Sequence, residues 1–239
     1  MKDPGAKPKN VLLPIFLIVA VDILGMTMIL PLLPFYAERY GASPQVVGLL
    51  VTSYALCQLI AGPILGKLSD RHGRRRLLII SQLGTFAGFL LLGWAKSLPL
   101  IFLARIIDGL TAGNLSLAQA YVSDVTEPET RAKSFGVLGI AFGLGFLFGP
   151  AMSGFLSQYD YSYPAWAAAG LSLTSVLCTY FLLPSARPNL DDETGPGGKR
   201  LGLLDWGAYA QYFRNRELAP ILFQFFCFCS MFSIFMSGF

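Results

Sequence analysis

Long apolar runs dominate the chain, and short polar segments separate them. Each run has about 20 residues, enough for a helix to cross the ~30 Å hydrocarbon core of a bilayer. Backbone groups in lipid must be satisfied within the segment, so each run is expected to be a helix. The pattern predicts an all-α, polytopic membrane protein with runs at roughly 11–35, 45–66, 77–95, 98–122, 135–157, 164–184 and 218–239.

The spacing of the runs divides the chain into three parts. Residues 185–217 form the longest connection and combine acidic and basic residues with several glycines and prolines, which is typical of a flexible linker. We therefore expect a six-helix bundle over 1–184, a linker over 185–217, and the start of a second transmembrane half over 218–239. Because no polar flank follows the seventh run, we expect the sequence to be part of a longer one.

The composition supports a membrane protein, and the positions of the charges predict its orientation. Hydrophobic residues make up 54% of the chain and charged residues 13%, compared with about 25% charged residues in soluble domains. The N-terminal tail, 67–76, 125–134 and 185–217 together carry 15 Lys and Arg residues, whereas the opposite loops carry only Arg39 and Lys96. This bias places the N-terminus and the linker in the cytoplasm. We expect a multi-pass protein of the inner or plasma membrane, whose partner is the lipid bilayer and not a nucleic acid.

The first run contains one charged residue, Asp22. Its neighbours on the same helical face are Ile18, Gly25, Met26 and Ile29, which would desolvate the carboxylate. Desolvation disfavours the charged form, so Asp22 could exchange protons near neutral pH. A role in helix packing, or as a partner for Arg105, is the alternative.

A polar stripe marks the fourth run. At about 100° per residue, one face within about 80° carries Arg105, Asp108, Ala112, Ser116 and Gln119. Ionisable groups inside a membrane are costly and usually functional. The stripe therefore either lines a cavity or forms an Arg–Asp pair that only holds helices together. In the second run, Tyr54 and Gln58 share a face and could add hydrogen bonds to such a cavity.

Glycines stand at specific places in a loop and in the fifth run. The basic loop after the second run includes Gly66, Asp70 and Gly73, and the topology rule explains its charges but not these offsets. Glycines allow helix backbones to approach closely, and we expect Pro150 to kink or break its helix.

One histidine and four cysteines inside apolar runs give no reason to expect a resident metal, cofactor or disulfide framework. No cluster of catalytic residues near one interface indicates an enzyme.

These residues resemble the major facilitator superfamily, in its branch of twelve-helix drug–proton antiporters that includes tetracycline exporters. The loop 66–76 matches the motif G-x-L-x-D-R-x-G-R-[RK], and Arg105 with Gly109 resembles R-x-x-x-G. The fifth run resembles G-x8-G-x3-G-P-x2-G-G, with Ser153 in place of one glycine. The first run resembles D-x-x-G…P-x-x-P. The matched positions of the first and fifth runs are Asp22, Gly25, Pro31, Pro34, Gly136, Gly145, Gly149, Pro150 and Gly154.

The resemblance implies a fold, a function and residue roles. The fold would be the N-terminal six-helix half of a major facilitator transporter that exports a small amphipathic molecule in exchange for protons. The substrate cavity would be lined by Asp22, Tyr54, Gln58, Arg105, Asp108 and Gln119. A cytoplasmic latch would comprise Gly66, Asp70, Arg71, Gly73, Arg74 and Asp124. A symporter or uniporter for sugars or metabolites in the same superfamily is the alternative, and the antiporter glycines disfavour it.

Overall fold

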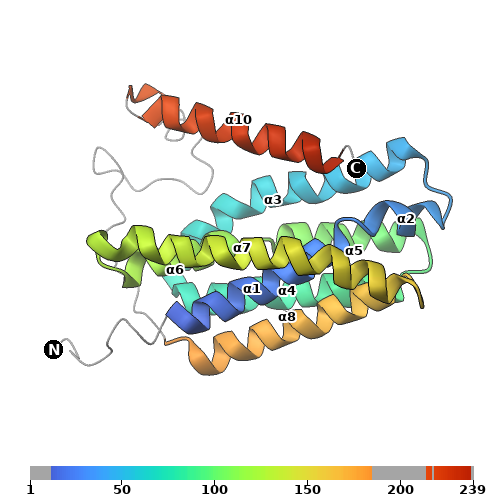
Figure 1. The fold of residues 1–239 in the computed structure, drawn as a ribbon, viewed down its shortest axis with the longest axis horizontal. Coiled ribbons are helices and arrows are strands. Elements are labelled where there is room, and N and C mark those ends of the chain that lie inside the picture. Colours follow the sequence, from blue (N-terminus) through green and yellow to red (C-terminus); the bar gives the residue numbers. More distant parts are fainter. Residues whose placement is uncertain (1–11, 185–213, 217, 238–239) are drawn as a thin grey trace. The chain divides into compact units, whose positions relative to one another are not determined.

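The computed structural model describes residues 12–184, 214–216 and 218–237. All regular secondary structure in this part of the chain is helical (Figure 1), which confirms the all-α prediction. Most of the predicted linker 185–217 lies outside the described residues. The helices are α1 (Leu12–Ile29), α2 (Leu33–Glu38), α3 (Pro44–His72), α4 (Arg74–Trp94), α5 (Leu98–Leu110), α6 (Asn114–Val125), α7 (Pro128–Ser157), α8 (Tyr163–Leu182) and α10 (Leu218–Ser237).

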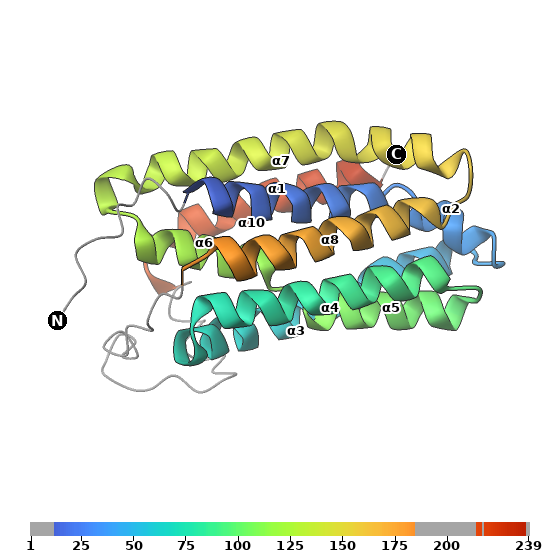
Figure 2. The same ribbon diagram turned by 90° about the horizontal axis from the view of Figure 1, so that it is seen from below.

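The chain divides into two compact units, Met1–Leu190 and Asp191–Phe239. The first contains α1 to α8, whose long helices lie side by side in a bundle (Figure 2). The second contains α10, the helix of the seventh apolar run. Six segments of the described chain are long and apolar enough to cross a membrane: Leu12–Ile29, Pro44–His72, Arg74–Trp94, Leu98–Val125, Pro128–Ser157 and Tyr163–Leu182.

Two helices organise the packing of the bundle. α1 packs mainly against α7 and α8, while α4 packs mainly against α8 and α5. The buried apolar side chains form two clusters. One includes Ile29, Leu92 and Ala168, and the other includes Ile18 and Leu78. α1 and α4 each contribute buried residues to both clusters, so each crosses the bundle from one cluster to the other.

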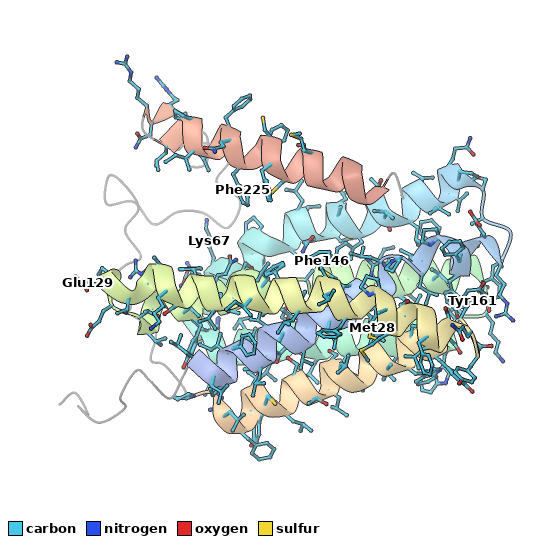
Figure 3. All side chains as sticks on the ribbon, viewed as in Figure 1. Met28, Lys67, Glu129, Phe146, Tyr161 and Phe225 are labelled. Atoms are coloured by element: carbon cyan, nitrogen blue, oxygen red, sulfur yellow. The ribbon has the colours of Figure 1, made fainter. Side chains whose placement is uncertain are left out.

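The bundle has two chemically different ends. Figure 3 shows Glu129 and Tyr161 at these opposite ends. The end near Glu129, called here the basic end, includes the α3–α4 junction at Gly73 and the side chains Arg71, Arg74, Arg75 and Arg131. The end near Tyr161, called the aromatic end, includes Tyr36, Tyr40, Trp94 and Trp166; the last two pack edge to face at 5.1 Å. Aromatic side chains are enriched at membrane–water interfaces.

A buried polar layer, formed by residues of α4, α5 and α8, lies between the two apolar clusters. On α4 it consists of Ser81, Gln82 and Thr85, which lie between Leu78 and Phe89. The layer is completed by Arg105 and Asp108 of α5, and by Ser172 and Ser175 of α8. Buried polar groups are costly unless they are hydrogen-bonded, so this layer is the part of the bundle that packing alone does not explain.

One sequence expectation about helix continuity is wrong. The fourth apolar run is not one helix, because the chain leaves the helix between α5 and α6 at residues 111–113. Pro150 does not break its helix, since α7 continues through it, and the kink that we expected there stays a prediction. Proline is tolerated in membrane helices where neighbouring groups satisfy the freed backbone carbonyl. The first run also ends earlier than expected, with a turn at 30–32 between α1 and α2.

Candidate functional site

A cavity of about 310 Å³ lies within the first unit and takes its lining from α1 and from α3 to α7. Five of the six residues predicted for the cavity line it, namely Asp22, Tyr54, Gln58, Asp108 and Gln119. Other polar residues of the lining are Thr85, Asn114 and Ser116, and large apolar ones are Met26, Phe89 and Phe142. The cavity thus combines aromatic and aliphatic surface with a few polar groups, the usual make-up of a small-molecule site.

The sixth predicted residue, Arg105, lies beside the cavity and neutralises one of its carboxylates. Its Nη1 is 3.0 Å from Asp108 Oδ2, and both side chains are buried. The guanidinium carbon lies 4.1 Å from the centre of the Tyr54 ring on α3, a cation–π contact worth about 1–2 kcal/mol in a desolvated setting. The ion pair joins residues of one helix, so it does not itself hold two helices together.

Asp22 of α1 is the second carboxyl group that lines the cavity. Its carboxyl interacts with the side chains of Gln82 and Ser175, and Asp108 is its charged neighbour. One carboxyl oxygen, Oδ1, is buried without a hydrogen-bond partner. Among the described residues no basic side chain forms an ion pair with Asp22, since Arg105 pairs with Asp108 instead. The cavity therefore contains one compensated carboxylate and one uncompensated carboxyl group.

The break between α5 and α6 directs polar groups into the cavity. Ser81 Oγ donates to the Thr111 carbonyl and accepts the Gly113 N–H at 3.0 Å, which satisfies backbone groups that the break releases. A Cβ atom on Gly113 would stand 2.9 Å from Leu65 Cδ1, so a side chain there would disturb the contact with α3. Asn114 follows and donates through Nδ2 to Thr85 Oγ1 at 3.4 Å. Its Oδ1 has no partner.

Sequence reasoning missed several polar residues around Asp22 and Asp108. Gln82, Thr85 and Ser175 carry no charge, so a search for intramembrane ionisable groups passes over them. A signal was nevertheless present, because two runs carry polar residues at helical spacing on one face. These residues are Ser81, Gln82 and Thr85 in one run, and Ser172, Ser175 and Thr179 in the other.

At the basic end, Arg74 connects the predicted latch residues. Its Nη2 is 2.5 Å from Asp70 Oδ1, and its Nε is 2.9 Å from Asp124 Oδ2. A third nitrogen donates to Ser69 Oγ at 2.6 Å. Gly73, between α3 and α4, has φ +95°, a conformation that side chains disfavour. These contacts join the end of α3, the start of α4 and the end of α6.

The other two latch residues lie near this network. Arg71 is exposed on the last turn of α3. Gly66 accepts a hydrogen bond from Ser69 Oγ through its carbonyl at 2.5 Å, and an added Cβ would meet no atom within 4 Å. The packing within this half of the molecule therefore does not explain why position 66 is glycine.

The glycines of α7 fall into two groups. A Cβ on Gly145 would lie 2.5 Å from Ile23 Cγ2, and one on Gly149 would lie 2.0 Å from Thr27 Oγ1, so both glycines allow close contact with α1. Thr27 Oγ1 donates to the Gly145 carbonyl at 2.8 Å. Gly136 and Gly154 would have open space around a Cβ. Pro150 is exposed beside this contact.

Comparisons with known proteins agree with this architecture. The tetracycline resistance protein of class B from Escherichia coli is 35% identical over 184 residues, covering 74% of this chain and 46% of that protein. Multidrug resistance protein 1 from Bacillus subtilis (strain 168) is 29% identical, covering 80% and 50%. The crystal structure of the human organic anion transporter TETRAN superposes with a TM-score of 0.67 at 25% identity, covering 77% and 49%.

The chain spans about half the length of these relatives. Over residues 15–239 it matches the sequence profile of the Major Facilitator Superfamily. With six apolar helical segments long enough to cross a membrane and a polar cavity between them, this multi-pass membrane protein belongs to the Major Facilitator Superfamily of transporters.

Proposed function

We propose that this chain is the N-terminal half of a proton-coupled exporter of small amphipathic molecules such as tetracycline-like drugs. The matched relatives include tetracycline and multidrug resistance proteins and are about twice as long. A second set of six helices would close the cavity from the side that this half leaves open. Transporters of this kind place the substrate between two halves that rock around it.

The uncompensated carboxyl of Asp22 is the observation that carries the proposal. It lines the cavity with one oxygen unpaired, and Asp108, the other cavity carboxylate, is neutralised by Arg105. A carboxyl group without a cationic partner binds a proton more readily than a paired one. Substrate and proton would therefore meet in the same cavity, and exposure of Asp22 to each side of the membrane in turn would couple their movements.

The basic end would be cytoplasmic and would act as a latch. The positive-charge bias of the sequence supports this orientation. Arg74 holds Asp70 and Asp124 in one network, and the end of a helix from the second half would dock on it when the transporter closes toward the cytoplasm. The carboxylate of Asp70 is half-exposed and would favour the positive N-terminal end of that helix.

Transport assays on Asp22→Asn test the proposal. The complete transporter, containing residues 1–239, is reconstituted in liposomes with an imposed proton gradient, and uptake of tetracycline and of ethidium is followed. We expect Asp22→Asn to lose uphill accumulation, since it has no carboxyl to protonate, and to retain exchange of substrate down its gradient. Asp160→Asn, outside the cavity, is the control and should pump normally.

Other outcomes would assign proton coupling to a different residue or exclude it from this half. Normal pumping by Asp22→Asn with loss in Asp108→Asn would place proton coupling on α5. Normal pumping by both variants would contradict a proton site in this half. Uptake that is driven in the same direction as the proton flow would identify a symporter and contradict export.

A further inference from the structure

Asn114 lines the cavity although a continuous helix would turn it elsewhere. Ala112 and Ser116 also line the cavity, and at about 100° per residue they lie within about 40° of each other on one helix face. Asn114 follows Ala112 by two residues, so a continuous helix would place it about 160° away from Ala112. The break at residues 111–113 removes this constraint and brings Asn114 to the cavity together with Ala112 and Ser116.

One face of α4 supports the break. Ser81 is fully buried, and its hydroxyl donates to the Thr111 carbonyl and accepts the Gly113 N–H at 3.0 Å. A continuous helix would pair these two backbone groups internally, so the Ser81 hydroxyl supplies in the break what the helix would otherwise supply. Three residues later, a Cβ on Gly84 would overlap the side chain of Thr111, so this glycine lets Thr111 lie against α4.

The amide of Asn114 has its donor side engaged and its acceptor unpaired. Nδ2 donates to Thr85 Oγ1 at 3.4 Å, and the Thr85 hydroxyl also interacts with the Asp108 carboxylate. A hydroxyl can only donate to a carboxylate, so the Thr85 oxygen is left to accept from Asn114, and the NH2 group of the amide is turned toward α4. Oδ1 of Asn114 has no donor among the described residues. Buried polar atoms nearly always have a partner, and an N–H or O–H group of a molecule in the cavity would supply one.

We propose that Asn114 accepts a hydrogen bond from the transported molecule and that Ser81 is the positioning residue that brings Asn114 to the cavity. The cavity would then select molecules that carry an N–H or O–H group on an apolar body, which fits the Met26, Phe89 and Phe142 surfaces of the same lining. Ser81 is not part of the lining, so it would act only through the break. This inference rests on the proposed function, because it assigns a contact within the proposed substrate site.

Equilibrium binding to the complete transporter in lipid nanodiscs, without a proton gradient, tests the contact with two cations. Ethidium carries two aromatic amino groups, and its deaminated analogue, the N-ethyl phenylphenanthridinium ion, has the same rings and charge without them. In Asn114→Ala we expect the affinity for ethidium to fall about tenfold, the effect of losing one hydrogen bond of ordinary strength. The affinity for the deaminated cation should match that of the wild type, because this cation has no donor. Equal losses for the two cations would overturn the contact, since Asn114 would then only shape the cavity.

A double-mutant comparison separates the positioning role of Ser81 from a loss of packing. Ser81→Ala should lower the affinity for ethidium, and the combined variant should bind no more weakly than Asn114→Ala alone, because Ser81 acts through Asn114. Gly84→Ala displaces the break by direct contact and should give the same result, so it provides the measurement if Ser81→Ala does not fold. Ser172→Ala is the matched control, since Ser172 is a buried serine outside the lining whose hydroxyl donates to the Gln82 carbonyl. This control should bind ethidium like the wild type.

The outcomes distinguish this inference from the proposed function. Additive losses from Ser81→Ala and Asn114→Ala would overturn the positioning role, and an equal loss in Ser172→Ala would also overturn it, because the effect would then be general to the polar layer. Proton-driven export of ethidium with wild-type affinity in Asn114→Ala would overturn the contact and leave the proposed function in place. Asn114-dependent binding of ethidium in a transporter whose Asp22→Asn variant pumps normally would support the contact and refute the coupling role.

Discussion

Replacing Gly149 by alanine is expected to destabilise the bundle by separating α1 from α7. The new Cβ would stand 2.0 Å from Thr27 Oγ1, 2.7 Å from Thr27 Cβ and 3.0 Å from the Thr27 backbone carbon. Rotation of the Thr27 side chain removes the first clash and leaves the other two, because Cβ and the backbone move only with the helix. Ordinary carbon contacts need about 3.5–4.0 Å, so the two helices must move apart by roughly 1 Å.

The cost has two parts. Overpacking of a well-filled interface typically costs 1–3 kcal/mol. The shift also stretches the hydrogen bond from Thr27 Oγ1 to the Gly145 carbonyl, which is 2.8 Å long, and losing it costs about 1 kcal/mol. We therefore expect the free energy of unfolding to fall by about 2–4 kcal/mol in Gly149→Ala. Reversible unfolding in mixed detergent micelles, followed by circular dichroism, measures this difference.

Gly154→Ala is the matched control on the same helix, since no atom lies within 4 Å of its added Cβ. Alanine is the better helix former by up to about 1 kcal/mol, so this variant should be as stable as the wild type or slightly more stable. Adding Thr27→Ala to Gly149→Ala should restore part of the lost stability, because it removes the nearest clashing atom. Equal stability of Gly149→Ala and Gly154→Ala would refute the reasoning from close helix contact.

The network at the basic end and the loop at the aromatic end give two further predictions. Transport should be slower in each of the single variants Arg74→Ala, Asp70→Asn and Asp124→Asn. When Arg74→Ala is combined with either carboxylate change, the initial transport rate should fall by less than the sum of the single effects, since one network is broken in each case. Strictly additive losses in initial transport rates would show that the charges act only as a topology signal. At the other end, the backbone N–H and the hydroxyl of Ser162 donate to Asp160 and lower the pKa of that carboxyl. The stabilising effect of the charged carboxylate is therefore present above its ordinary pKa near 4 and is lost as the pH falls below it. Thermal unfolding of Asp160→Asn should thus differ from that of the wild type at pH 6 and converge with it at low pH, and a constant difference would contradict this.

Much of the fold followed from the length of the apolar runs. Bilayer thickness fixes how many apolar residues a helix needs, so six spanning helices could be predicted from composition along the chain. The break in the fourth run could not be predicted in this way. Residues 111–113 are apolar or small enough to continue a helix, and the chain leaves it because Ser81, a residue of another helix, satisfies the released backbone groups.

The candidate site was predicted in its charged members and in Tyr54, Gln58 and Gln119, and missed in other neutral residues such as Gln82 and Ser175. Asp22, Arg105 and Asp108 are conspicuous because a charge inside lipid is costly wherever it points. A glutamine or serine in an apolar run has no charge to mark it, so the sequence offers only its position on a helical face, and its importance depends on which partner it meets. Only the packing of α8 against both α1 and α4 brings Gln82 and Ser175 to Asp22.

The sequence by itself determined the class of protein, the number of spanning segments and the charged residues inside those segments that are candidates for function. These depend on the cost of moving each residue from water into lipid. The tertiary structure alone decided which charges are paired and which glycines of α7 face α1. Arg105 neutralises Asp108 and leaves Asp22 without a cation. Pairing and close contact are set by distances between atoms on different helices, and these distances arise only when the helices pack together.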